Sequence, residues 1–285
     1  MLNTKKGPAV QSLRVQSDKD LYSSAIKQSL METENIFVFQ DEVIDLLVDD
    51  NIVHGVITKR GNKIYSKKVI LTTGTFLKGK IYIGDYVGEG GRISENPSNS
   101  LSESLKNYNF ELIRLKTGTP ARVNIRSIDF SKLTEQKGDD EINFFSLYAK
   151  LINLKPIGDI SCHMARSNSE TNRIISENKN SLPLYSGKIT GIGPRYCPSF
   201  EDKVMKFKDK ESHIIFVEPE GLNTNSVYLN GISTSLSEEL QYKLLSTIPG
   251  FENIEIMKPA YAVEYDGINP LQLNKTLESK KLKNL

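Results

Sequence analysis

The chain has 285 residues, of which 25% are charged, and a formal net charge of +2. This length allows a substantial core and more than one lobe, whereas the charge balance excludes a globally basic protein and leaves only a local patch for a polyanionic partner. Two cysteines exclude a disulfide framework and predict a reducing, cytoplasmic location, and no apolar run approaches the ~20 residues that a membrane helix needs.

The first elements are a helix and a series of short strands. Apolar residues recur at helical spacing over 18–33, and Ser17 with Asp20 resembles a capping box. Short apolar stretches follow, separated by Asp, Asn and Gly turns, and this spacing predicts an antiparallel meander. The predicted strands are 35–39, 43–48, 52–58 and 63–65.

The stretch 68–77 has a different character. Its β-branched residues show no alternation, which is typical of a parallel strand buried on both faces. Its carboxyl end contains Thr-Thr-Gly-Thr, with Gly74, and glycine at the carboxyl end of such a strand allows a ligand to approach the backbone. A helix, a meander and such a strand follow the first βαβ unit in two-dinucleotide-binding flavoproteins. By this analogy we expect an α/β fold with a partial, Rossmann-like FAD-binding domain, and the analogy predicts no reaction.

The next region combines glycines, a helix and a strand. Four glycines between 84 and 92 predict a loop of low steric bulk, and a helix with Leu101 and Leu105 follows. A strand at 110–115 leads into a second Thr-Gly-Thr sequence that lies between Lys116 and Arg122. These two cations indicate an anion site, with solvated charges at a strand end as the alternative.

The composition shifts between residues 121 and 210. We interpret this part as an inserted α+β domain for NAD or substrate, between FAD-binding parts at 1–120 and 211–285. The pair Cys162-His163 has no further Cys or His nearby and is a poor metal site, so we expect no metal. The other expected elements are helices at 168–177 and 238–247 and strands at 214–217, 227–229 and 260–265.

The segment 191–203 is predicted to be a shaped loop that opens a helix. Two glycines and two prolines fix its backbone, and Ser199 is the predicted N-cap of a helix with acids in its first turn. Cys197 lies just before this helix and two residues from Arg195, where a thiolate is favoured. Local chemistry supports a nucleophile and simple packing of Cys197 inside a turn about equally.

Seven motifs follow one another in a specific order. They are Asn3-Thr4-Lys5-Lys6-Gly7-Pro8-Ala9, Leu71-Thr72-Thr73-Gly74-Thr75-Phe76-Leu77, Leu115-Lys116-Thr117-Gly118-Thr119-Pro120, Gly193-Pro194-Arg195-Tyr196-Cys197-Pro198-Ser199, Glu218-Pro219-Glu220-Gly221-Leu222, Asn230-Gly231-Ile232-Ser233-Thr234-Ser235 and Thr276-Leu277-Glu278-Ser279-Lys280. In these motifs the whole chain resembles the glucose-inhibited division protein A family, the MnmG enzymes that modify tRNA.

The resemblance implies an activity and its partners. MnmG enzymes bind FAD and NADH, form homodimers and work with the GTPase MnmE. They add a carboxymethylaminomethyl group to C5 of the wobble uridine in tRNA, with methylene-tetrahydrofolate as carbon donor and glycine or ammonium as nitrogen source. The related folate- and FAD-dependent tRNA (uracil) methyltransferase is the alternative, which the third and seventh motifs disfavour.

The resemblance also assigns residues. Val43 and Ser98 match FAD-contacting positions, and Gly74 is the expected point of close ligand approach. Cys197 matches a functionally implicated cysteine, a nucleophile or acid in the uridine chemistry, which Arg195 would orient or make more acidic. The segment matched to NAD consists of Gly193, Pro194, Arg195, Tyr196, Cys197, Pro198, Ser199, Phe200, Glu201, Asp202, Lys203, Val204, Met205, Lys206 and Phe207.

Two parts of the family pattern do not occur in this sequence. Family members begin with a GxGxxG unit that holds the FAD pyrophosphate, and they end in a helical C-terminal domain that meets MnmE and tRNA. We therefore expect the middle portion of the enzyme, with weak FAD binding by the chain alone. A truncated and inactive form, completion by a separate N-terminal FAD-binding fragment, and a non-catalytic remnant are the alternatives that remain open.

Overall fold

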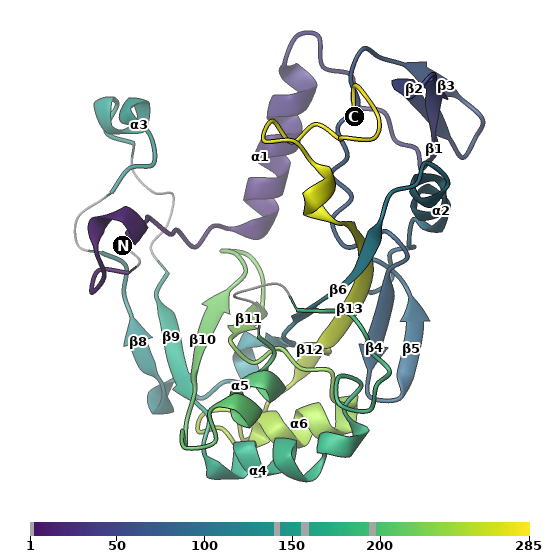
Figure 1. The fold of residues 1–285 in the computed structure, drawn as a ribbon. Helices are drawn as coiled ribbons and strands as arrows, with labels where there is room; N and C mark the ends of the chain where they lie inside the picture. Colours follow the sequence, from purple (N-terminus) through teal and green to yellow (C-terminus); the bar gives the residue numbers. More distant parts are fainter. Residues whose placement is uncertain (1–2, 140–142, 155–159, 194–197) are drawn as a thin grey trace.

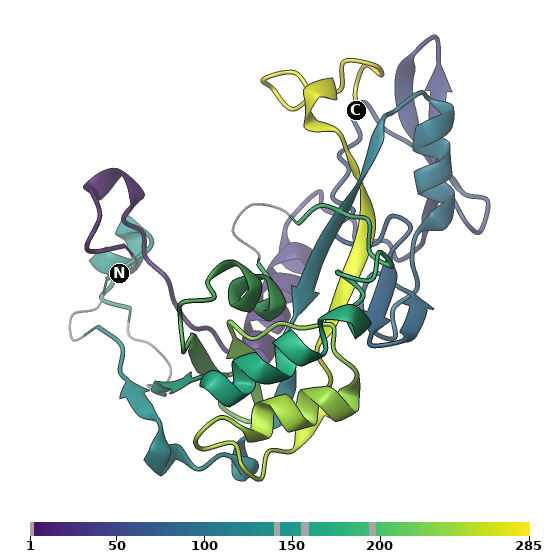
Figure 2. The same cartoon turned by 60° about the horizontal axis from the view of Figure 1, so that its bottom comes forward.

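The computed structural model of the chain describes residues 3–139, 143–154, 160–193 and 198–285. In these ranges three antiparallel sheets and several short helices make up the molecule, and the two ends of the chain lie far apart (Figures 1 and 2). The mixture of helices and sheets confirms the predicted α/β class. Parallel pairing within the described residues is confined to isolated bridges.

A three-stranded meander forms the first sheet, as predicted. Its strands are β1 (Val43–Asp49), β2 (Ile52–Thr58) and β3 (Lys63–Tyr65). Asp50 and Asn51 both have positive φ in the turn between β1 and β2, a conformation that Asp and Asn tolerate better than most residues. Helix α2 (Asn99–Asn107) packs its buried leucines onto this sheet.

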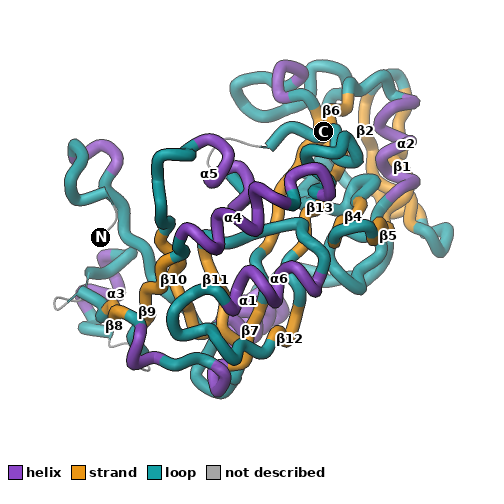
Figure 3. The backbone as a smooth tube through the Cα atoms, turned by 90° about the horizontal axis from the view of Figure 1, so that it is seen from below, coloured by secondary structure: helices purple, strands orange, loops and turns teal. Residues whose placement is uncertain are grey.

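A six-stranded sheet in the order β12-β7-β11-β10-β9-β8 carries the largest hydrophobic cluster. Its strands are β7 (Arg122–Asn124), β8 (Thr134–Gln136), β9 (Cys162–Arg166), β10 (Ile214–Pro219), β11 (Ser226–Asn230) and β12 (Ile256–Lys258). Three helices lie together across one face of this sheet (Figures 1 and 3), and their apolar residues complete the cluster. They are α4 (Ser169–Glu177), α5 (Phe200–Lys206) and α6 (Glu238–Ser246).

This sheet crosses one of the predicted domain boundaries. Strand β9 precedes residue 210 and pairs with β10, which follows it, so that Ala165 lies opposite Ile215. The boundary predicted at residue 210 therefore falls inside a single sheet. The division into 1–120, 121–210 and 211–285 stays a prediction.

A four-stranded sheet in the order β5-β4-β13-β6 lies between the meander and the six-stranded sheet (Figure 1). Its strands are β4 (Lys80–Ile83), β5 (Tyr86–Glu89), β6 (Leu112–Thr119) and β13 (Tyr261–Ile268). Strand β13 pairs with β6 along its full length and with β4 on its other side. The loop predicted at 84–92 contains β5, because Gly84, with φ of 55°, closes a tight turn between β4 and β5.

Two predicted strands are not formed. The stretches 35–39 and 68–77 contain no strand, apart from one isolated bridge at Leu77. Phe37 is 93% exposed and Ile70 is 85% exposed, so these two apolar residues face outward, whereas Leu77 is buried. The physical reason is that a strand requires a continuous neighbour for its backbone groups. Within the described residues, 35–39 pairs with no strand, and 68–77 has only isolated backbone contacts, such as the hydrogen bond from the Val69 N–H to the Asn284 carbonyl at 2.9 Å.

The remaining helices lie on the periphery. They are α1 (Lys19–Glu32) and α3 (Leu147–Leu151), with short 3₁₀ turns at Pro8–Val10, Ile125–Ser127, Phe130–Lys132, Lys179–Ser181 and Pro270–Gln272. Helix α1 buries none of its side chains. Its N-cap is Asp18 and not the predicted Ser17, because the Asp18 carboxylate accepts from the Leu21 N–H at 2.9 Å. Within the described ranges no helix has both the length and the apolar character for a bilayer crossing.

Candidate functional site

Helix α5 begins as predicted from the sequence. Ser199 is its N-cap, and a capping box joins Ser199 and Asp202 reciprocally. Phe200 and Val204 are buried in the large cluster, whereas Phe207 is half exposed after the helix ends. The first helical turn thus carries acidic side chains within the segment to which the sequence assigned NAD.

Buried polar contacts fix α5 to the loop between β11 and α6. Glu201 is 1% exposed, and its Oε1 accepts from Thr234 Oγ1 at 2.7 Å and from the Ser235 N–H at 2.8 Å. Lys203 Nζ donates to the Gly231 carbonyl at 2.8 Å. The sixth sequence motif, residues 230–235, therefore holds this helix in place.

Asp202 has two further neighbours besides its cap. Lys116 Nζ lies 3.4 Å from Asp202 Oδ2, and the Lys116 side chain is 4% exposed. Burial, together with the nearby Asp202 and Glu201 carboxylates, raises the pKa of Tyr185 to about 12. Tyr185 is therefore a neutral hydroxyl at physiological pH.

Residues 190 and 191, which lead into the loop predicted at 191–203, are held by one buried carboxylate. Glu264 Oε1 accepts from the Thr190 N–H at 2.8 Å, from Thr190 Oγ1 at 3.0 Å and from the Gly191 N–H at 2.6 Å. Its Oε2 accepts from Arg114 Nη2 at 2.9 Å and from Tyr82 Oη at 3.2 Å. Burial alone would raise the pKa of Glu264, but these hydrogen bonds outweigh it and hold the pKa below its ordinary value.

Four charged side chains share one face of the four-stranded sheet. Arg114 lies opposite Asp266, and Lys116 lies opposite Glu264, in the register of β6 and β13. Alternate residues of a strand point to the same face, so two cations and two carboxylates lie on that face. Arg114 also joins Asp266 through Nη1 at 2.9 Å, which makes the group compact and electrically balanced.

The sequence suggested a different use for Lys116, together with the nearby Arg122. Lys116 and Arg122 were expected to flank an anion site at the second Thr-Gly-Thr. Lys116 is paired with Asp202, whereas Arg122 donates to the Pro120 carbonyl and lies 3.4 Å from Glu220 Oε1. Both cations are thus engaged by groups of the chain itself, which disfavours an anion site at that corner.

The residues assigned to FAD lie around the meander and α2. Val43 begins β1 and packs against the cluster beneath α2. Ser98 is the N-cap of α2 and makes no side-chain capping hydrogen bond there, while its N–H donates to the Phe76 carbonyl at 2.8 Å. Gly74 has φ of 55°, and a Cβ there would meet only Phe76, at 3.8 Å. This open turn beside a helix N-terminus fits an extended anionic ligand.

The predicted catalytic pair and its immediate neighbours, Pro194, Arg195, Tyr196 and Cys197, lie outside the described residues. The adjoining Gly193 and Pro198 are both exposed. The chain's other cysteine, Cys162, is half-buried, and burial with the nearby Glu218 raises the pKa of its thiol. No group of three or more metal-ligating side chains occurs in the part of the chain that the structure describes.

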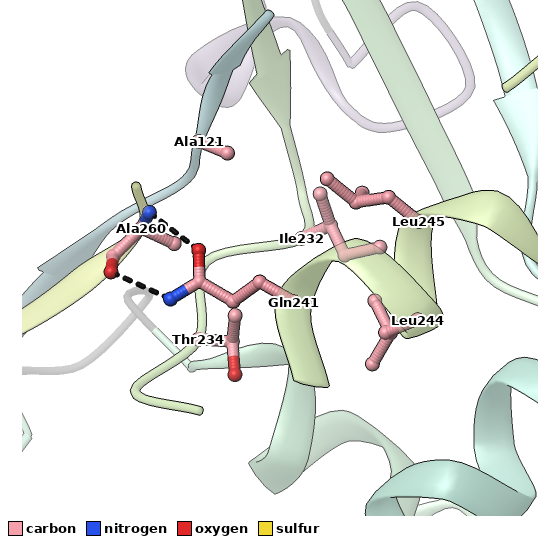
Figure 4. Close-up of a pocket in the computed structure, with 7 residues that line it drawn as sticks. All are labelled: Ala121, Ile232, Thr234, Gln241, Leu244, Leu245 and Ala260. Carbon is pink, nitrogen blue, oxygen red and sulfur yellow. Dashed lines mark hydrogen bonds between the residues drawn. The ribbon is translucent and has the colours of Figure 1, made fainter. Parts of the chain in front are cut away.

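A pocket beside α6 is filled by its own side chains (Figure 4). Gln241 Nε2 donates to the Leu236 and Ala260 carbonyls at 2.7 and 2.9 Å, and its Oε1 accepts from the Ala260 N–H at 2.7 Å. The lining residues leave no room for a water molecule between them. This contact positions the start of β13 and is not a ligand site. The residues that line it are Ala121, Ile232, Thr234, Gln241, Leu244, Leu245 and Ala260.

Glu264 is the residue that the sequence interpretation missed. A signal was present, because Glu264 and Asp266 are spaced by two in an otherwise apolar strand. Arg114 and Lys116 show the same spacing at the end of the strand predicted at 110–115. Charges at a spacing of two on two apolar strands indicate a buried ionic pairing.

Comparison with known proteins relates the whole chain to one family. The family model for glucose inhibited division protein A matches residues 1–285. The tRNA uridine 5-carboxymethylaminomethyl modification enzyme MnmG of Clostridium botulinum (strain Okra / Type B1) is 51% identical over 285 residues, which are 100% of this chain and 45% of that protein. The protein of the same name from Borreliella burgdorferi (strain ZS7) is 50% identical over 287 residues, covering 100% of this chain and 46% of that protein.

The fold leads to the same relatives. The structure of Aquifex aeolicus GidA in its form I crystal superposes with a TM-score of 0.92 at 48% identity, covering 100% of this chain and 48% of that chain. The form II crystal gives a TM-score of 0.90 at 45% identity, covering 100% of this chain and 46% of that chain. The chain therefore spans about half the length of the relatives that it matches. It belongs to the glucose inhibited division protein A family.

Proposed function

We propose that this chain is part of a tRNA-modifying flavoenzyme that adds a carboxymethylaminomethyl group at C5 of the wobble uridine. The observation that carries the proposal is 51% identity along the entire chain to an enzyme named for that modification. Transfer RNA, the GTPase MnmE and a second copy of the chain are the partners proposed with it. Folate is the proposed carbon donor.

FAD is the proposed cofactor, and Val43, Gly74 and Ser98 are its proposed contacts. Ser98 and the open turn at Gly74 support this assignment, since a backbone free of side-chain bulk beside a helix N-terminus suits a phosphate-bearing ligand. When bound, FAD supplies hydride and electron transfer. The sequence in hand contains no GxGxxG turn, so we expect the isolated chain to bind FAD weakly. A stoichiometric flavin spectrum of the purified chain would contradict this expectation.

NADH is proposed to bind along the segment 193–207, and Cys197 with Arg195 is proposed to act on the uridine. The firm attachment of α5 supports a binding role for this segment, because Glu201 and Lys203 fix the helix through buried contacts. In the proposed reaction the Cys197 thiolate serves as nucleophile or, when protonated, as acid, and Arg195 favours the thiolate.

A chimera tests this function directly. The 285 residues would replace the matching segment of the Clostridium botulinum enzyme, and the chimera would be expressed in a bacterium that lacks its own enzyme. We expect restored wobble-uridine modification, measured by mass spectrometry of tRNA nucleosides. The Cys197→Ser chimera should lose the modification, whereas the Cys162→Ser chimera should retain it. A folded chimera that binds FAD and leaves the uridine unmodified would refute the proposal.

The open alternatives concern how the chain acts outside such a chimera. The exposed apolar residues at 36–39 and Ile70 favour association with a further polypeptide, because surfaces of this kind are typical of interaction sites. Co-purification of a fragment that carries the GxGxxG unit would support assembly. A non-catalytic remnant would show neither a companion fragment nor activity.

A further inference from the structure

We propose that Lys116 and Glu264 are positioning residues that together fix residues 190–193, at the start of the proposed NADH segment, and residues 199–202 within it; these two stretches, on either side of residues 194–198, are called the flanks below. The inference rests on the proposed function for its purpose and on the geometry for its content. The two residues are direct cross-strand neighbours on β6 and β13, and both are buried. The two residues of this one cross-strand pair thus contact both flanks.

Glu264 holds the flank that enters the segment. One of its oxygens accepts from two consecutive backbone N–H groups, at Thr190 and Gly191. The same stretch also lies along the open edge of β6, where the Ile192 N–H donates to the Arg114 carbonyl at 3.0 Å. A Cβ at Gly191 would lie 3.0 Å from Glu264 Cγ, so the backbone approaches the carboxylate as closely as glycine allows.

Lys116 contacts both flanks. Its backbone N–H donates to the Ile192 carbonyl at 3.0 Å, and its ammonium group lies 3.4 Å from Asp202 on the first turn of α5. Separating the buried Lys116 ammonium group from Asp202 is costly, because it would remove this cation from its carboxylate partner away from water. The pair therefore sets the distance between the entry of the segment and the helix that follows.

An amide at position 264 would not reproduce these contacts. Glu264 accepts on both oxygens: Oε1 faces the Thr190 and Gly191 N–H groups, and Oε2 faces Arg114 and Tyr82. Glutamine has a single carbonyl oxygen. Whichever way it is turned, its NH₂ group faces other donors, although its shape is unchanged. Glu264→Gln is therefore a near-isosteric probe.

Asp266 supplies the matched control. It lies two residues from Glu264 on the same strand and face and shares Arg114, but its other contact is Ser102 on α2. Asp266→Asn disturbs the same charged group without touching residues 190–191. Any effect that comes from general loosening of the sheet will appear in both variants.

The first measurement is hydrogen exchange of the purified 285-residue chain, read by mass spectrometry. We expect Glu264→Gln to accelerate exchange in peptides that cover 190–192 by about tenfold or more, because in either orientation the NH₂ group opposes donors: it faces the Thr190 and Gly191 N–H groups directly, or it faces Arg114 and Tyr82 and displaces the side chain from residues 190–191. Lys116→Met should accelerate exchange at 199–203 instead. Equal exchange at 190–192 in the Glu264→Gln and Asp266→Asn variants would overturn the inference.

The second measurement uses the full-length chimera and separates positioning from a merely structural role. We expect Glu264→Gln to raise the KM for NADH about tenfold with a smaller change in kcat, whereas Asp266→Asn shifts neither preferentially. An unchanged KM in a variant with accelerated exchange would remove the link to NADH and overturn the proposal. If the unmodified chimera oxidises no NADH, the proposed function fails, and the exchange measurement alone then decides whether the two residues fix the flanks.

Discussion

Among single residues, the buried polar atoms without hydrogen-bond partners are the most informative. Within the described residues they include Glu201 Oε2, His163 Nδ1 and His213 Nε2. Groups of this kind cost free energy in the folded state, so their substitution should change stability measurably. His213 offers the clearest case, because burial lowers the pKa of its ring.

The first prediction is that His213 makes stability depend on pH. Burial, with Lys203 and Lys210 nearby, lowers the pKa of His213 below its ordinary 6.5. The folded state therefore binds this proton less readily than the unfolded state. The resulting stabilisation is complete above pH 6.5 and is lost as the pH falls from 6.5 toward the lowered pKa.

Thermal melts of the chain between pH 7.5 and 5 would measure this effect. We expect His213→Phe to flatten the pH dependence of the melting temperature in this window. His54→Gln, on an exposed position of β2, should leave the dependence as it is. An unaltered slope in His213→Phe would show that other groups cause it.

The second prediction concerns the space at Gly191. A methyl group there would lie 3.0 Å from the Leu115 carbonyl oxygen and from Glu264 Cγ. We expect Gly191→Ala to lower the free energy of unfolding by about 1–3 kcal/mol, measured by urea denaturation. Gly7→Ala is the control, since a Cβ at Gly7 meets nothing within 4 Å. Equal stability of the two variants would mean that residues 190–192 lie further from β6.

Between secondary-structure elements, the sequence predicted helices better than strands. The N-caps Asn168, Ser199 and Ser237 all initiate the expected helices, because a cap and its helix are determined by adjacent residues. The meander was also predictable from its turns. The strands expected at 35–39 and 68–77 fail because strand formation depends on a neighbour that local sequence does not reveal.

The candidate site shows the same limit. Helix α5 lies within the predicted NAD segment, and its start could be predicted from Ser199 and the acidic first turn. The partners of that helix, by contrast, come from residues 116 and 230–235, which only the tertiary fold brings close. The role of Glu264 was hidden for the same reason, since its contacts at Thr190 and Gly191 are 74 and 73 positions away.

The third prediction concerns how α1 is joined to the six-stranded sheet. Asp18 caps α1 through one oxygen and accepts from the Leu222 N–H at 2.8 Å through the other. Because α1 buries no side chain, this double hydrogen bond is a principal attachment of α1 to the loop that follows β10. We expect Asp18→Ala to accelerate limited proteolysis within residues 11–35 several-fold. Asp20→Ala, in the same helical turn, should change cleavage much less; similar rates in both variants would contradict this attachment.

For the whole molecule, the distribution of apolar surface is uneven. Phe37 and Ile70 are almost fully exposed, and Val38 and Phe39 are exposed by 65% and 59%. Soluble monomers rarely show adjacent large apolar residues of this kind. The fourth prediction follows from this surface.

We expect the chain to bind the dye ANS and to self-associate as its concentration rises. The double variant Phe37→Ser, Phe39→Ser should reduce both effects, as measured by dye fluorescence and light scattering. Phe145→Ser is the control, because Phe145 is 67% exposed but belongs to a different segment. A double variant that binds as much dye as the original chain would show that the dye-binding apolar surface lies elsewhere.

The central place of β13 in its sheet has a consequence for how the protein is made. This strand lies between β4 and β6, although it is the last strand in sequence order. During translation β4 and β6 leave the ribosome long before β13, their shared neighbour. Until β13 emerges, the edge of each strand that will pair with it has unpaired backbone N–H and C=O groups. Nascent chains halted before residue 261 should therefore be the ones that most need chaperones.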